Sequence, residues 1–392
     1  MVMGSDSYGI YVHIPFCSQF CIYCDFYSVK QRSNRETLLK CLEREILLAG
    51  EERSIVERIN KRGVGTIYFG GGTPSVLRAD QLIVLLDTVR KNHRCLSGGA
   101  KEITVEVNPD DVTLPYLKEL KSGGFNRLSI GIQSFEDANL KWMNRRHTGK
   151  EAIKAFDCAR DAGFGNISID LIFGYEMLSD GVWESTINRA LSLKPEHISA
   201  YQMGVEPGTP LQRLVADGKY RAPEDEVASG QYRILQEILA AAGYRQYEVS
   251  NFSKPEYESQ HNSSYWDFTP YLGFGPSAHS FYGGRRSWNC SSLNRYISEI
   301  SKGRTPRGGF EILGEEEQFN EFIMLSLRRI SGINQRILRD RYSRFITEDF
   351  QISVNRQKMV GNLIDDGEYI KIPPERLFIS DGIIRSIYWS NP

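Results

Sequence analysis

The sequence predicts an α/β protein with a parallel sheet, followed by a smaller helical region. Strand patterns and helix patterns alternate through about the first 245 residues, and short connections separate them. Such a series makes a parallel sheet with right-handed crossovers, either doubly wound or curled into a barrel. At 392 residues the chain is long for one domain and can bury a substantial core.

Six segments carry the β-branched and aromatic residues that are typical of strands. They are residues 8–14, 64–69, 102–107, 127–132, 166–173 and 197–202. Apolar residues at helical spacing, or a proline that opens a helix, predict helices between and after these strands. They are residues 34–52, 79–91, 114–122, 150–162, 183–193 and 223–242. Together the two series give about six β/α units.

The pattern changes twice after these units. Residues 247–288 are rich in Tyr, Phe, Trp, Gly, Ser and Asn with little helical periodicity, so we expect ordered irregular structure over the opening of the sheet. Helices are then expected, followed by a short hairpin, which together resemble a winged-helix module. The helices are residues 311–327, 333–342 and 355–365, and the hairpin joins 370–372 to 377–384. The predicted parts are a core of residues 1–245, a connecting segment of residues 246–308 and a C-terminal domain of residues 309–392.

Charge and hydropathy argue against two classes of partner. With 48 basic and 49 acidic residues the formal net charge is −1, which gives no electrostatic footprint for nucleic acid. No stretch approaches the roughly 18 consecutive apolar residues of a transmembrane helix, and the start of the chain lacks a signal-peptide pattern. We therefore expect a cytoplasmic protein with no membrane span and no nucleic-acid partner.

Three cysteines stand at C-x-x-x-C-x-x-C spacing directly after the first strand. Pro15 ends that strand, so Cys17, Cys21 and Cys24 fall in the loop that follows. Three thiolates so close together suit a soft metal centre, and their odd number leaves one iron of a four-iron cluster without a protein ligand. The alternatives are a zinc site, which usually takes a fourth Cys or His, a disulfide, which needs an oxidising compartment, and burial as small hydrophobic side chains. The remaining cysteines are scattered and are expected to be structural: Cys41, Cys95, Cys158 and Cys290.

Conspicuous residues follow the next strands, at the ends where parallel α/β proteins carry their chemistry. The run from Gly70 to Pro74, GGGTP, follows the second strand; successive glycines let backbone approach a ligand, although a tight turn would use them equally. Glu106 and Asp170 place acids among strand hydrophobics, which is costly unless they are paired or bind a ligand. A charge at an exposed strand end, satisfied by a backbone amide, is the alternative for both. Gln133 ends the fourth strand.

The segment HNSSYW, residues 261–266, places His261 among aromatic residues. A neutral imidazole is a good ligand for haem iron, and neighbouring aromatic rings can cover a porphyrin face. A single histidine in such surroundings is often a hydrogen-bonded packing residue instead, so the residues alone leave both roles open. His279 is a further candidate ligand, without a motif around it.

The cysteine spacing, with an aromatic residue just before the third cysteine, resembles the signature of the radical SAM enzymes. In that family the three cysteines hold a [4Fe–4S] cluster, S-adenosylmethionine chelates the fourth iron, and reduction yields methionine and a 5′-deoxyadenosyl radical. The resemblance implies a partial (β/α)6 barrel with a C-terminal helical, winged-helix-like domain. It also implies an S-adenosylmethionine pocket formed by Tyr11, Tyr23, Gly71, Gly72, Thr73, Glu106, Gln133, Arg145 and Asp170. Arg146 is the alternative to Arg145 in that set.

The HIPFC lead-in and the CDF tail around these cysteines are similar to the oxygen-independent coproporphyrinogen III oxidase group, and most of all to its HemW branch. H-N-x-x-Y-W is the motif associated with haem binding in that branch. It implies His261 as the candidate ligand of haem iron, with Tyr265 and Trp266 beside it. The true oxidases carry a further cysteine two positions after the third, where this chain has Phe26.

Three functions therefore compete. The resemblance favours a haem chaperone that carries a [4Fe–4S] cluster and S-adenosylmethionine and passes haem to haem-requiring proteins, for example respiratory enzymes; a homodimer is compatible with it. The second is radical decarboxylation of coproporphyrinogen III to protoporphyrinogen IX, against which Phe26 and the HNSSYW motif argue. The third is a radical SAM enzyme with another substrate, in which the motif only packs.

Overall fold

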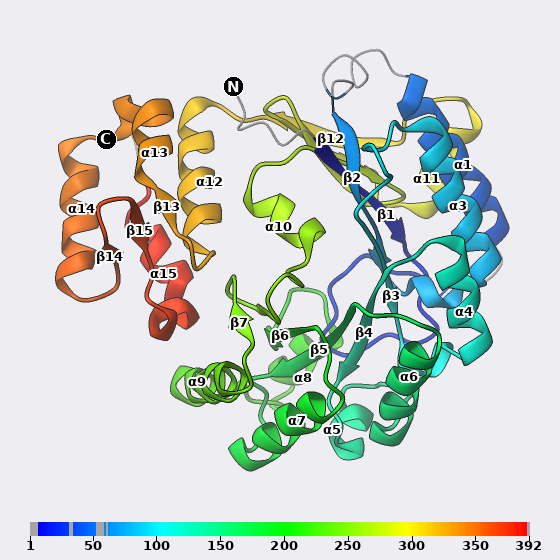
Figure 1. The fold of residues 1–392 in the computed structure, drawn as a ribbon, viewed down its shortest axis with the longest axis horizontal. Coiled ribbons are helices and arrows are strands. Elements are labelled where there is room, and N and C mark those ends of the chain that lie inside the picture. Colours follow the sequence, from blue (N-terminus) through cyan, green and yellow to red (C-terminus); the bar gives the residue numbers. More distant parts are fainter. Residues whose placement is uncertain (1–6, 31–33, 52–58, 60–61, 390–392) are drawn as a thin grey trace.

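The computed structural model describes residues 7–30, 34–51, 59 and 62–389 (Figure 1). Six parallel strands lie side by side in chain order, and each pairs with the next. They are β1 (Ser7–Ile14), β2 (Gly63–Gly71), β3 (Glu102–Val107), β4 (Arg127–Gln133), β5 (Ile167–Phe173) and β6 (His197–Gln202). This order confirms the predicted partial (β/α)6 barrel.

Helices follow these strands and form the outer layer of the barrel (Figure 1). The long ones are α1 (Arg35–Glu51), α3 (Ala79–Asn92), α4 (Leu114–Gly123), α6 (Gly149–Asp161), α7 (Asp180–Ser192) and α9 (Asp225–Ala241). Their bounds agree closely with the predicted ones; the predicted end of the first helix at residue 52 lies outside the described residues. Short helical turns were not predicted: η1 (Pro74–Val76), η2 (Pro109–Asp111), α5 (Asp137–Trp142) and α8 (Pro210–Ala216).

The sheet continues beyond both edges of the barrel strands. Next to β1 lies the parallel strand β9 (Tyr271–Phe274), and antiparallel strands extend the sheet from there. They are β10 (His279–Tyr282), β11 (Arg285–Asn289) and β12 (Arg307–Ile312). At the other edge β8 (Asn251–Ser253) pairs with β6, and β7 (Arg245–Gln246) with β8. The expectation of irregular structure over residues 247–288 was therefore wrong, because strands of three to five residues are too short to show a clear alternation.

The motif HNSSYW lies on a helix, α10 (Gln260–Trp266), rather than in an irregular segment. Figure 1 shows α10 between the barrel strands and the C-terminal helices. Its first turn is fixed from two sides. The Ser259 side chain accepts from the Asn262 amide, and the carboxylate of Glu102, at the start of β3, accepts from the amides of Gln260 and His261 at 2.8 and 3.0 Å. These contacts supply partners for the free amides of a helix start.

The C-terminal region is mostly helical. Its helices are α12 (Glu315–Leu327), α13 (Gln335–Tyr342), η3 (Ser343–Phe345), α14 (Glu348–Met359), η4 (Pro374–Ile379) and α15 (Ser380–Arg385). The preceding helix, α11 (Leu293–Ser301), lies beside α1 instead (Figure 1). A small sheet runs in the order β13 (Ile333–Asn334), β15 (Tyr369–Lys371) and β14 (Ile364–Asp365). The predicted hairpin was wrong in its second strand, because residues 374–385 are helical after Pro373 and β15 pairs with β13 and β14 instead. The three-part division of the chain stays a prediction.

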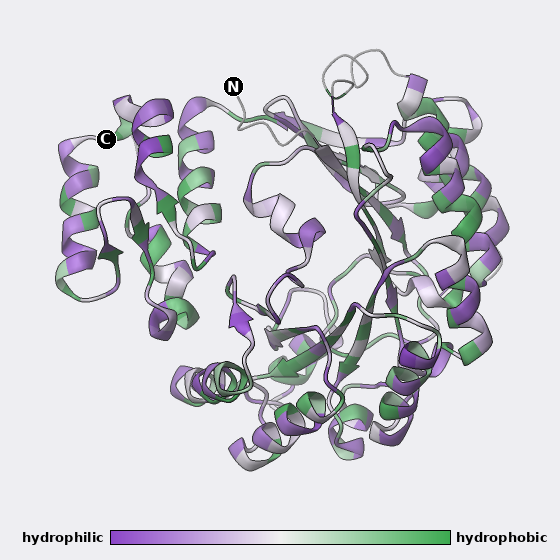
Figure 2. Cartoon of the chain, in the orientation of Figure 1, coloured by the Kyte–Doolittle hydropathy of each residue, from purple (hydrophilic) through white to green (hydrophobic). Residues whose placement is uncertain are grey.

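Hydrophobic residues form a continuous buried cluster from β1 to the C-terminal helices. Figure 2 shows hydrophobic residues on the barrel strands, while the surrounding helices carry both kinds, as expected for amphipathic helices on a buried sheet. Among the described residues, no helix combines the length and the apolar character that crossing a membrane requires.

Candidate functional site

The cysteine loop follows β1 at the carboxyl end of the barrel. Backbone hydrogen bonds tie its two ends together, since the Cys17 amide donates to Val29 and the Val29 amide donates to Pro15. The Ile22 amide donates to Met143, which fixes the middle of the loop against the segment after β4. All three thiols are partly exposed and free, so the disulfide alternative finds no support in the described structure.

Polar groups from the following strands meet these thiols. The Thr73 hydroxyl lies 3.4 Å from the Cys17 sulfur, and the Arg145 guanidinium donates to the Cys21 sulfur at 3.5 Å. Burial raises the pKa of Cys17, and it raises that of Cys24 to about 12. Both thiols therefore favour the protonated form unless a metal supplies positive charge.

The residues present fit an iron–sulfur cluster by their donor chemistry. No three His, Cys, Asp or Glu side chains of the described residues are already gathered as a metal-ligand group. Three accessible thiols on one loop nevertheless form a set of soft ligands, which is the set that such clusters take. Zinc has no evident fourth ligand here, because both ring nitrogens of the neighbouring His13 are engaged, one by the Tyr11 hydroxyl and the other by the Tyr27 carbonyl.

The glycine run at the end of β2 packs directly against the end of β1, where the cysteine loop begins. Gly71 has φ of +112°, and a Cβ atom there would lie 2.6 Å from the His13 ring. A Cβ atom on Gly72 would lie 2.8 Å from the backbone of Pro15. Only glycine allows this approach, so the run is more than an ordinary tight turn. The amide of Gly71 donates to Glu106 at 3.3 Å, which joins two residues of the expected S-adenosylmethionine pocket.

Glu106 and Asp170 are both half-buried in the barrel and both hydrogen-bonded. Burial raises the pKa of Glu106 to about 7, and the Tyr68 hydroxyl donates to it at 2.8 Å. Asp170 accepts from the Ser129 hydroxyl at 3.0 Å, and burial raises its pKa too. Neither acid therefore lies at a fully exposed strand end, although Glu106 does accept from a backbone amide, that of Gly71. Tyr11 adds its ring to this group, since it stacks on Tyr68 with ring centroids 6.1 Å apart.

Arg145 reaches the cysteine loop and Arg146 does not. The Arg145 guanidinium donates to Asn108 at 2.9 Å, to the Gly131 carbonyl and to Cys21, whereas Arg146 pairs with two aspartates of η2. Gln133 has φ of +67°, a strained value that aims its side chain back over Gly131 near Arg145. Tyr23 packs on the core from within the cysteine loop. The geometry therefore favours Arg145 over its neighbour.

His261 lies inside the amino end of the barrel, only 1% exposed. Its Nδ1 lies 2.8 Å from the Thr66 hydroxyl, its Nε2 lies 3.0 Å from the Tyr265 hydroxyl, and its ring stacks on Tyr68 with centroids 5.1 Å apart. Burial lowers its pKa to about 3, with a smaller effect of the buried Arg127, so the imidazole is neutral. The neutral ring is the form that binds metal, but in this conformation both ring nitrogens are engaged.

The other two candidates around the haem motif lie apart from this ring. Trp266, at the end of α10, lies under the Arg328 guanidinium at 5.8 Å from the ring centroid. His279 is on β10, is exposed, and stacks on Trp288. The structure therefore gathers His261 and Tyr265 and leaves His279 on the strand next to β9.

Sequence reasoning missed three residues that build the site. Thr66 and Tyr68 alternate along β2 and contact His261, so strand alternation alone could have placed them inside the barrel. Glu102, an acid at the start of a strand, holds α10. No local pattern points to that contact, since its partners are more than 150 residues later.

Known proteins resemble the chain along most of its length. The model of the Radical SAM superfamily matches residues 11–190. The haem chaperone HemW of Bacillus subtilis is 38% identical over 85% of this chain and 86% of that protein. The mitochondrial radical S-adenosyl methionine domain-containing protein 1 of Danio rerio is 32% identical over 97% of this chain and 86% of its own. The solved structure of coproporphyrinogen III oxidase (HemN) from Escherichia coli aligns at a TM-score of 0.82 and 22% identity, over 98% of this chain and 91% of that one, which shows a shared fold.

Proposed function

Because the chain belongs to the radical SAM superfamily and, within it, to the HemW family, we propose that it is a haem chaperone. It binds haem and transfers it to haem-requiring proteins, among which respiratory enzymes are the proposed class. The observation that carries the proposal is the complete H-N-x-x-Y-W motif, folded as a helix that seals the amino end of the barrel with a neutral, buried histidine. Relatives named as haem chaperones support it, the Bacillus subtilis protein among them.

Cys17, Cys21 and Cys24 would hold a [4Fe–4S] cluster at the other end of the barrel. A reduced cluster would supply one electron to S-adenosylmethionine, whose S–C5′ bond would then break to give methionine and a 5′-deoxyadenosyl radical. The residues that would bind S-adenosylmethionine are Tyr11, Tyr23, Gly71, Gly72, Thr73, Glu106, Gln133, Arg145 and Asp170. Support comes from the Arg145 guanidinium on Cys21 and from the Glu106 carboxyl on the Gly71 amide, which join this set to the loop.

His261 would bind haem iron through one ring nitrogen. That role requires one of the two hydroxyl groups to give up its contact with the imidazole, either Thr66 at Nδ1 or Tyr265 at Nε2. The neutral state of the imidazole means that no proton has to leave first. Tyr265 and Trp266 would lie beside the macrocycle. A homodimer remains part of the proposal.

Coproporphyrinogen III decarboxylation is the second candidate, and the fold shared with the Escherichia coli oxidase is what favours it. Against it stands Phe26, which is 68% exposed at the position where the oxidases carry a cysteine. A large exposed aromatic side chain cannot supply the thiolate that this position gives in the oxidases.

The test is an anaerobic haem titration of the cluster-reconstituted protein, followed by Soret absorbance, with His261→Ala and His279→Ala in parallel. We expect saturable binding near one haem per chain that weakens in His261→Ala and not in His279→Ala. Absence of saturable binding in the wild type would overturn the chaperone proposal and lead to a coproporphyrinogen turnover assay. Weaker haem binding in His279→Ala alone would identify His279, on β10, as the iron ligand in place of His261.

A further inference from the structure

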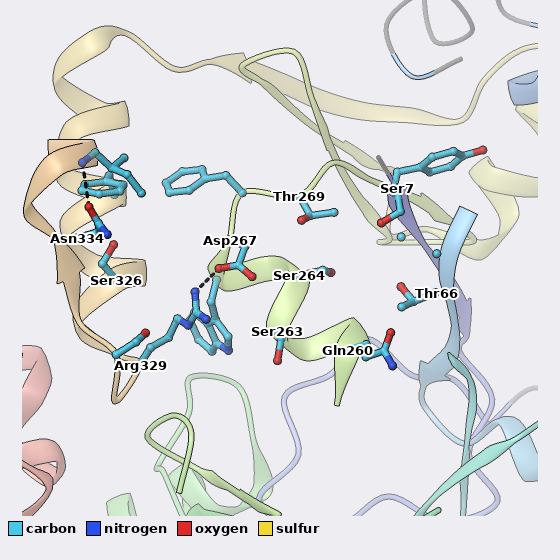
Figure 3. A pocket seen from close by; sticks show the side chains of 18 of the residues that line it. Ser7, Thr66, Gln260, Ser263, Ser264, Asp267, Thr269, Ser326, Arg329 and Asn334 are labelled. Atoms are coloured by element: carbon cyan, nitrogen blue, oxygen red, sulfur yellow. Dashed lines mark hydrogen bonds and ion pairs between the residues drawn. The ribbon is translucent and has the colours of Figure 1, made fainter. Parts of the chain in front are cut away.

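A cavity of about 830 Å³ lies on the outer side of α10, between the amino ends of β1 and β2 and the helices α12 and α13. Figure 3 shows Ser263 of α10 between Thr66 of the barrel and Ser326 of α12. Its volume is within the range of about 300–1,000 Å³ that small-molecule sites take. The cavity therefore has the size of a ligand site, and none of the expected S-adenosylmethionine residues lines it.

Cations outnumber acids among the residues that line this cavity. Lys101, Arg329 and Arg341 are its basic residues, and Asp267 is its acid. Arg329 forms an ion pair with Asp267, drawn as a dashed line in Figure 3. Arg341 lies over the ring of Tyr342 and pairs with no carboxylate in the described part of the chain. The net charge of the lining favours an anionic ligand.

Aromatic side chains supply the apolar walls. Phe268 and Phe322 stack with centroids 6.3 Å apart, from the segment after α10 and from α12. Trp266 lines the cavity as well, and its indole Nε1–H is buried without an acceptor among the described residues. The indole ring thus adds to the apolar wall, whereas its buried Nε1–H does not face the open space of the cavity.

The same helix carries both the cavity and the haem motif. Thr66 lines the cavity, and its hydroxyl lies 2.8 Å from His261 Nδ1 on the inner side of α10. The imidazole and the cavity are thus separated by a single side chain. A ligand in the cavity would lie against the motif without entering the packed barrel.

We propose that this cavity is the seat of the tetrapyrrole, with Arg329 and Arg341 binding its two propionates and the aromatic walls covering its planar face. The inference rests on the proposed haem function and adds to it a location and two residues outside the motif. A planar apolar ring with two carboxylates matches the aromatic, cationic lining. Asp267 then competes with the propionate for Arg329, because Asp267 pairs with this guanidinium when no ligand is bound.

Two probes test the proposal on the full chain: haem, read by Soret absorbance, and metal-free protoporphyrin IX, read by fluorescence anisotropy. Arg329→Gln/Arg341→Gln should weaken binding of both at least tenfold, because the porphyrin without iron meets the same propionate contacts. Asp267→Asn should tighten both, because it frees Arg329. A general folding defect would weaken binding in both variants, so a gain of affinity in one and a loss in the other would point to the ligand contacts. Arg336→Gln/Arg339→Gln removes the same charge from α13 outside the cavity lining and should leave both affinities unchanged.

The dimethyl ester of haem is a third probe, because its two propionates are esterified and carry no negative charge. It should bind the wild type as weakly as haem binds the double arginine variant. Wild-type affinity of the double variant for haem, or equal binding of haem and its ester, would overturn the cavity proposal and leave the chaperone function standing. Absence of haem binding in the wild type would overturn the chaperone function itself, and with it this proposal.

Discussion

Replacing Glu102 by Gln should loosen α10 while leaving the rest of the barrel in place. One oxygen of Glu102 accepts from the His261 amide and the Ser259 hydroxyl, and the other accepts from the Gln260 amide. A glutamine keeps the first oxygen and turns an NH₂ group toward the Gln260 amide, so one charge-assisted hydrogen bond is lost, at about 1.5–3 kcal/mol. Loss of the negative charge at a helix start adds about 0.3–1 kcal/mol. The expected cost to the helix is about 2–4 kcal/mol.

Native-state hydrogen exchange measures this cost where it arises. A loss of about 2 kcal/mol should speed exchange in a peptide covering residues 260–266 by roughly 30-fold if α10 opens locally. The matched control is Glu151→Gln, which removes a carboxylate from the exposed start of α6, where it accepts from the Thr148 amide. That variant should change exchange at α6 and not at α10. Wild-type exchange of residues 260–266 in Glu102→Gln would refute the view that β3 holds the motif helix.

Three further perturbations follow from the barrel geometry. Burial raises the pKa of Glu45 to about 7 from an ordinary 4.5, so the folded state keeps a proton that the unfolded state releases. Stability should fall by about 3 kcal/mol as pH rises from about 4.5 to 7, and urea midpoints of Glu45→Gln should lack this part of the pH dependence; parallel curves for the two proteins would contradict the assignment. Gly71→Ala should destabilise the fold by about 2–4 kcal/mol and weaken S-adenosylmethionine binding, because the added methyl group meets the His13 ring at a positive φ; unchanged melting temperature and unchanged calorimetric affinity would exclude this. Arg145→Met should lower the iron retained per chain after reconstitution, whereas Arg146→Met should retain the wild-type amount, and equal retention in the two would remove Arg145 from the site.

The candidate site residues at the strand ends were predictable, because each can be recognised from the few residues around it in the sequence. Gly71, Glu106 and Gln133 each lie at or next to the last residue of their own strand, and a parallel sheet brings those ends together without any knowledge of packing. The position of His261 was not predictable in the same way. Its contacts with Thr66 and Tyr68 join segments almost 200 residues apart, and α10 is too short to show helical periodicity. The sequence left ligand and packing roles open, and the structure shows a histidine that packs while keeping the neutral form a ligand needs.

Tyr68 is the side chain at which the two expected sites meet. Its hydroxyl donates to Glu106, a residue of the proposed S-adenosylmethionine pocket, while its ring stacks on His261 of the haem motif. Successive inward residues of β2 extend this arrangement, since a Cβ atom on Gly70 would meet Glu106 at 2.9 Å and Thr66 contacts the imidazole two residues before Tyr68. Interiors are close-packed, so a shift of Glu106 at the carboxyl end changes the surface on which the imidazole rests. The two proposed sites are therefore separated by one ring and not by a layer of core.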